Sequence, residues 1–124
     1  MQNENIMVIV LFEVVIKKEY EDAYLAVANS LKNELAKAKG FIRGERFSSF
    51  TAEGKLLSLS VWESEQAVEN WRNQQQHRIG QQCGRNSMFE GYTITVLSTI
   101  RSYTDICRDQ APDDSNKYLG IFTK

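Results

Sequence analysis

The chain has 124 residues, of which 42% are hydrophobic and 25% charged, and its formal net charge is −1. This length and composition predict one globular domain, and the near-zero charge argues against a nucleic acid or an anionic membrane as partner. The sequence contains two cysteines, Cys83 and Cys107, and one histidine, His77. No metal site is therefore expected, and the cysteines are expected to be free thiols in a reducing compartment.

The N-terminal region argues against a secreted or membrane protein. It lacks the basic segment that opens a signal peptide, and no stretch approaches the roughly 20 apolar residues that span a bilayer. We therefore expect a cytoplasmic protein. Residues 7–16, MVIVLFEVVI, are apolar on both alternating faces, which predicts a strand that is covered on both sides.

An amphipathic helix is predicted after this strand. Its apolar stripe, with residues spaced three or four apart, consists of Tyr20, Tyr24, Val27, Leu31, Leu35 and Ala38. Gly40 is expected to end the helix.

Residues 41–50 and 55–62 predict two strands, joined by a hairpin in which Gly54 takes a left-handed turn position. Strict alternation places Arg46 on one face of the first strand. On the opposite face it places Phe41, Arg43, Glu45 and Phe47. In the second strand, Ser58, Ser60 and Trp62 share a face. Ser64 is expected to cap a second helix that runs to about residue 85, and residues 92–103 predict the last strand.

The element order βαββαβ predicts an α+β, ferredoxin-like fold with a four-stranded antiparallel sheet and both helices on one face. The other face would then be bare, although residues 7–16 are apolar there too. Because an exposed apolar face usually marks a partner, we expect a homodimer. Residues 1–104 would form the domain. Residues 105–124 are polar around Pro112 but end in KYLGIF, so this tail is expected to dock on its own subunit or on the partner's.

The stretch LSLSVWESEQAVENWRNQQQHRIGQQCGR and a strand ending in RSY make the chain similar to the antibiotic-biosynthesis-monooxygenase-like (ABM) family over residues 7–104. This resemblance implies a dimeric α/β barrel of ferredoxin-like halves, with a pocket between the sheet and the helices. It also implies kinship with cofactor-independent oxygenases that convert phenolic or anthrone-like polyketides into quinones, so no cofactor is expected.

A haem-degrading branch of the same family uses an asparagine on the first strand, a tryptophan on the second helix and a histidine ten residues later. Trp71 fits the tryptophan, but Gln81 stands at the histidine position. The first strand has Leu11 and Phe12 near the place of the asparagine. The resemblance therefore disfavours haem degradation.

The candidate site residues each have a functional and a structural interpretation. His77 is either a general base near neutral pKa or a surface residue, because a continuous helix turns it away from the stripe of Trp71; a break in NQQQ would be needed to bring it inward. Trp71 is a pocket wall or core packing. Trp62 with Ser58 and Ser60 fits a cavity lining, and Arg46 either orients a phenolate or carboxylate or protects a sheet edge.

The resemblance, together with the surface of Trp62, Ser58 and Ser60, implies a cofactor-independent, quinone-forming monooxygenase that acts on a small aromatic or polyketide-like substrate. The alternative is a dimer that binds a small hydrophobic or aromatic ligand without catalysis, because no obvious acid–base pair is present.

Overall fold

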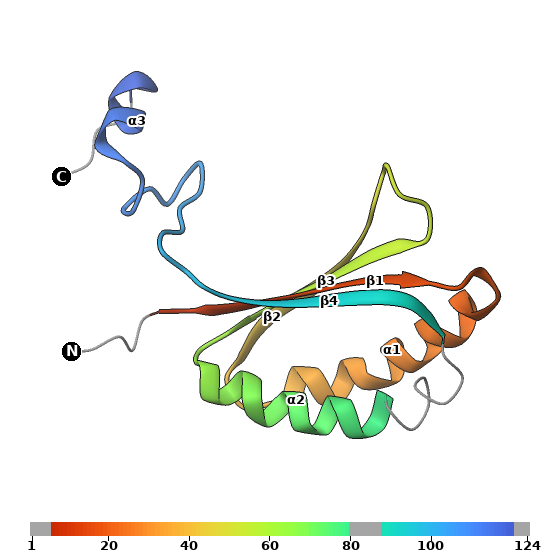
Figure 1. Ribbon diagram of the computed structural model, residues 1–124. Helices are drawn as coiled ribbons and strands as arrows, with labels where there is room; N and C mark the ends of the chain where they lie inside the picture. The colour runs from red at the N-terminus through yellow and green to blue at the C-terminus, as the bar shows by residue number, and fades with distance from the viewer. Residues whose placement is uncertain (1–5, 80–87, 121–124) are drawn as a thin grey trace.

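The computed structural model describes residues 6–79 and 88–120, with only the backbone for residues 75–79. The strands are β1 (Val8–Ile16), β2 (Phe41–Ser48), β3 (Lys55–Trp62) and β4 (Phe89–Ser98). The helices are α1 (Glu21–Lys37), α2 (Glu65–Ile79) and α3 (Asp113–Tyr118), and a 3-10 turn spans Lys18–Tyr20. The strands form an antiparallel sheet in the order β2-β3-β1-β4. With α1 and α2 on one face (Figure 1), the predicted ferredoxin-like fold is confirmed.

The strand register sorts the side chains into two faces, because directly paired residues of neighbouring strands point to the same side. The face toward α1 and α2 (the helix face) consists of four rows across β2, β3, β1 and β4. They are Phe41–Trp62–Val8–Ser98, Gly44–Ser60–Val10–Val96, Arg46–Ser58–Phe12–Ile94 and Ser48–Leu56–Val14–Tyr92.

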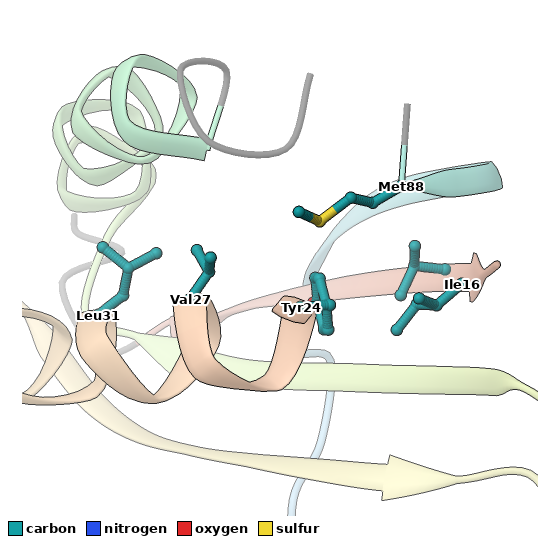
Figure 2. Close-up of a cluster of buried hydrophobic side chains, with 6 residues drawn as sticks. Ile16, Tyr24, Val27, Leu31 and Met88 are labelled. Carbon is teal, nitrogen blue, oxygen red and sulfur yellow. The ribbon is translucent and has the colours of Figure 1, made fainter. Parts of the chain in front are cut away.

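The first core cluster (the Val14 cluster) joins the middle and start of α1 to one end of the sheet. Its buried members are Val14, Ile16, Tyr24, Val27, Leu31 and Met88. Figure 2 shows Tyr24, Val27 and Leu31 on successive turns of α1, pointing to the same side. This is the stripe that the three- and four-residue spacing predicts. Burying each such side chain stabilises the fold by roughly 1.5–3 kcal/mol.

The second cluster (the Trp62 cluster) lies at the other end of the helix face. Its buried members are Trp62, Ala67 and Trp71, and Leu35 from the last turns of α1 packs against them. The predicted cap of α2 is confirmed, because the backbone N–H of Ala67 donates to the Ser64 hydroxyl at 3.2 Å. The stripe of α1 therefore ties the two clusters together.

Two predictions about the strands are wrong. The pairing of β2 with β3 shifts between Phe41 and Arg43, so a bulge moves Phe41 to the helix face, together with Arg46, while Arg43 points to the opposite face. The last strand spans Phe89–Ser98 rather than 92–103. It ends there because Ser98 pairs with Val8, the first residue of β1, and no strand continues beyond that point.

The second face of the sheet (the open face) carries no helix in the described part of the chain (Figure 1). Its apolar side chains are Ile9, Leu11, Val15, Leu57, Leu59, Val61, Phe47 and Leu97. Phe47 and Leu97 are exposed, whereas Ile9, Leu11, Leu57 and Leu59 are half-buried. The second apolar face predicted for residues 7–16 is therefore present, on the open face of the sheet.

Candidate functional site

Trp62 is the anchor of the candidate site. Its side chain is only 1% exposed, and its ring lies between those of Phe41 and Trp71, with centroid distances of 5.4 and 6.3 Å. The indole N–H donates to the Ser60 hydroxyl at 2.8 Å, which supplies the partner that a buried N–H requires. Trp62 and Trp71 thus hold a rigid aromatic wall at one end of the helix face.

The middle of the helix face (the central band) lies between the buried residues of the two clusters, with Val10 packed against the Trp62 cluster and Phe12 against the Val14 cluster. Its side chains are small on β2 and β3 and apolar on β1 and β4: Gly44, Ser58, Ser60, Val10, Phe12, Ile94 and Val96. Of these, Ile94 is 50% and Val96 49% exposed. Small residues opposite partly exposed apolar ones are the composition expected of a surface that takes up a small apolar ligand.

Arg46 lies at the β2 edge of the central band, directly across from Ser58 on β3. Its guanidinium donates to the Asn29 side-chain oxygen on α1 at 2.8 Å, so the helix fixes the direction of the arginine. Asn29 is neutral, so this contact leaves the positive charge of Arg46 uncompensated. A fixed cation beside a hydroxyl can bind a phenolate, enolate or carboxylate oxygen.

Four of the five predicted binding residues therefore lie on one face of two strands, and the fifth lies on the helix that packs on that face. Ser58, Ser60 and Trp62 of β3 share a face, and Arg46 of β2 joins them. Trp71 of α2 contacts Trp62 from above the sheet. Their role in binding stays a prediction.

His77 lies in the last turn of α2. The helix runs without interruption through residues 73–76, so the break that was needed to bring His77 inward is not present. The side chain of His77 lies outside the described residues, as do residues 80–87, which include Cys83. The role of His77 as a base therefore stays a prediction as well.

Sequence reasoning missed Asn29 and Tyr92. Asn29 is an ordinary exposed helix position until α1 is placed beside β2. Tyr92 is 61% exposed and adds a phenol hydroxyl at the edge of the central band, with its ring 5.7 Å from that of Phe12. Only the pairing of β1 with β4 places it on the helix face, and no local pattern gives that register.

A separate groove of about 390 Å³ lies at the β2–β3 hairpin end of the sheet. It is lined by Leu11, Glu13, Phe47, Ser48, Ser49, Lys55, Leu56 and Leu57, none of them a predicted site residue. Lys55 and Glu13 form an ion pair at 3.2 Å inside it, so the two charges neutralise each other and the rest of the lining is largely apolar.

Within residues 6–79 and 88–120, no three His, Cys, Asp or Glu side chains gather as a metal site would require. None of the helices in that part of the chain is long and apolar enough to cross a membrane.

Comparison with known proteins matches residues 7–82 to the antibiotic biosynthesis monooxygenase family. The chain is 38% identical over 99 residues to the jasmonate monooxygenase ABM of Pyricularia oryzae; the match covers 77% of this chain and 46% of that protein, so it spans about half of the relative's length. It is 28% identical over 86 residues to the uncharacterized protein YqjZ of Bacillus subtilis, covering 69% of this chain and 74% of the relative.

Solved structures share the fold. Rv0793 of Mycobacterium tuberculosis superposes with a TM-score of 0.67 at 15% identity, over 79% of this chain and 99% of that one. PA3566 of Pseudomonas aeruginosa gives 0.66 at 11% identity, over 80% and 99%. The matched segment runs from β1 through α2 and contains the Trp62 wall, Arg46 and Asn29. The chain therefore belongs to the antibiotic biosynthesis monooxygenase family.

Proposed function

We propose that the protein is a cofactor-independent monooxygenase that acts on a small, flat, hydrophobic substrate of the anthrone or naphthol type. Family membership over residues 7–82 supports the reaction class. The observation that carries the substrate class is the central band, which combines apolar side chains with one fixed cation and two hydroxyls.

The chemistry requires no added reductant for a substrate with an acidic C–H bond next to a carbonyl. The ring CH₂ of an anthrone loses a proton, and the resulting enolate carbon transfers electrons to O₂ and forms a C–O bond. Loss of water then leaves the quinone carbonyl, so that CH₂ and O₂ become C=O and H₂O. All four electrons that reduce O₂ come from the CH₂ carbon of the substrate, and the two oxygen atoms end in the new carbonyl and in water.

Arg46 and Ser58 are the residues that we propose hold the enolate oxygen. Directly opposite residues on paired antiparallel strands have Cβ atoms about 4.5–5.5 Å apart, so both side chains can reach one oxygen atom. A cation and a hydroxyl aimed at developing negative charge lower the barrier to proton loss. The Trp62 wall and the apolar residues of β1 and β4 would bind the rings.

The test measures oxygen consumption with a panel of anthrones, naphthols and quinols in the presence of a metal chelator. With the anthrones and naphthols we expect consumption above the uncatalysed rate at the same pH, with one O₂ used per quinone formed and no hydrogen peroxide, whereas a quinol oxidised only to its quinone would release hydrogen peroxide. Since the Pyricularia oryzae relative is named for jasmonate, jasmonate is tested with and without NADH, because hydroxylating an unactivated C–H bond needs two external electrons. A panel compound that binds tightly and is recovered unchanged under oxygen would instead establish a binding protein.

Replacing Arg46 with glutamine is expected to lower kcat/KM for the active substrate about 10- to 100-fold. The reason is the loss of a charge-assisted hydrogen bond of about 1.5–3 kcal/mol. Arg43→Gln is the matched control, since Arg43 is an arginine of the same strand that points to the open face. Equal kcat/KM values for the Arg46 and Arg43 variants would show that Arg46 does not take part in binding or turnover of the substrate.

A further inference from the structure

Residues 99–120 (the arm) form an ordered unit that projects from the domain. The arm leaves the end of β4, where the Thr99 backbone N–H donates to the Met7 carbonyl at 2.9 Å. Figure 1 shows it rising on the side of the open face, with α3 well away from the sheet and from α1 and α2. Among the described residues, every hydrogen bond of residues 102–120 stays within that segment.

Arg108 organises the arm from inside. It is only 8% exposed and donates to the side chains of Asn116 at 2.6 Å and Ser115 at 3.0 Å, and to the Thr104 carbonyl at 3.0 Å. Its guanidinium also lies 5.2 Å from the centre of the Tyr103 ring. A buried cation with this many partners fixes the loop and α3 as one piece.

The arm exposes several large apolar side chains among its polar and charged ones. Ile106 is 84% and Tyr118 88% exposed, and Ile100 and Leu119 are exposed as well. The arm buries the charged Arg108 while these large apolar side chains stay exposed, the reverse of what is usual for these residue types. Exposed apolar groups of this kind, held in a fixed shape, indicate a surface that another protein surface covers.

We propose that the arm of each chain packs on the open face of a second copy of the chain, over the groove at the β2–β3 hairpin end. The arm and the open face lie on the same side of the sheet (Figure 1), so a second copy that covers this face must meet the arm. Two-fold symmetry then exchanges the two arms.

The place of the arm at one end of the sheet determines that it meets the groove of the second copy. The arm rises at one end of the sheet and the β2–β3 hairpin lies at the other (Figure 1). When two copies face each other with their strands running in opposite directions, the arm of one lies at the hairpin end of the other. With the strands in the same direction, both arms would occupy the same end. The groove's apolar lining on the open face, Leu11, Phe47 and Leu57, suits the arm's exposed apolar side chains.

The arm contains a residue that can be cross-linked chemically, because Cys107 is a free, exposed thiol. In a full-length chain with Cys83→Ser, a second cysteine is introduced in the groove as Phe47→Cys. A short bis-maleimide is expected to join Cys107 of one copy to residue 47 of the other and give a covalent dimer. Asn33→Cys, on the exposed surface of α1, is the matched control and should give no more dimer than Cys83→Ser alone.

Each other outcome overturns the proposal. A link between Cys107 and residue 47 within one chain would mean that the arm folds back on its own sheet. A dimer by sedimentation without the Phe47→Cys product would place the arm elsewhere, and a stable monomer would leave no second copy to bind.

A second variant tests the arm without altering the groove. Arg108→Met removes the three hydrogen bonds inside the arm and is expected to raise the dimer dissociation constant at least tenfold in sedimentation equilibrium. Arg72→Met, which changes an exposed arginine of α2 outside the arm and the open face, should leave it unchanged. Equal dissociation constants for the two variants would show that the ordered arm contributes nothing to association.

Discussion

Replacing Trp62 with alanine is expected to lower the free energy of unfolding by about 3–5 kcal/mol, the usual range for a buried tryptophan or phenylalanine. Trp62 is almost completely buried and its ring contacts both Phe41 and Trp71. Its removal would leave a cavity between the sheet and α2 that these rigid rings cannot fill. Urea unfolding followed by far-UV circular dichroism, at one protein concentration for all variants, measures the loss. A loss below about 1 kcal/mol would contradict the packing.

The hydrogen bond of Trp62 can be separated from its packing by a double-mutant cycle. Ser60→Ala strands the buried indole N–H, which is expected to cost about 1–3 kcal/mol. Trp62→Phe removes the N–H, so adding Ser60→Ala to that variant should cost far less. A coupling of about 1 kcal/mol or more is therefore expected, whereas additivity within about 0.5 kcal/mol would show that the bond is not formed.

The fold could be predicted because each element depends on local signals. The stripe of α1, Ser64 as a cap and Gly54 in a left-handed turn are all properties of a few neighbouring residues. The same alternation that identifies β3 also puts Ser58, Ser60 and Trp62 on one face. Local chemistry thus predicts which elements form and which of their side chains share a face.

Register and tertiary placement could not be predicted in this way. The bulge after Phe41 moves that ring to the helix face, where it packs against Trp62, a contact between strands that no local pattern gives. The pair formed by Arg46 and Asn29 depends on where α1 lies over β2. The end of β4 at Ser98 is set by where β1 begins.

The arm is the part of the described chain whose structure is least evident from its sequence. Its composition is that of a polar tail, and the residue that organises it, Arg108, resembles any surface arginine in the sequence. The structure shows that Arg108 is buried and donates hydrogen bonds to Thr104, four positions earlier, and to Ser115 and Asn116, seven and eight positions later. Because these partners are polar side chains and one backbone carbonyl, the contacts leave no periodic pattern of apolar residues from which they could be predicted.

Gly40→Ala is expected to be the second severe substitution, with a loss of about 2–5 kcal/mol in the free energy of unfolding. Two independent costs add at this position. Gly40 has φ +88°, a conformation that costs a residue with a side chain about 1–2 kcal/mol. A Cβ there would also lie 2.5 Å from the Cβ of Ala67, a member of the Trp62 cluster, and such overpacking costs about 1–3 kcal/mol more.

Gly54→Ala separates these costs, since Gly54 has φ +80° but its nearest neighbour to an added Cβ is the Ile16 carbonyl oxygen at 3.6 Å. It should therefore lose only the backbone part, about 1–2 kcal/mol. Adding Ala67→Gly to Gly40→Ala removes the clashing methyl, so the double variant should be more stable than the sum of the two single losses implies, even though glycine inside α2 costs about 1 kcal/mol by itself. Equal losses for Gly40→Ala and Gly54→Ala would mean that α2 can move away from Gly40 without disturbing Trp62. In that case the aromatic wall on which the proposed substrate surface depends would not be rigid.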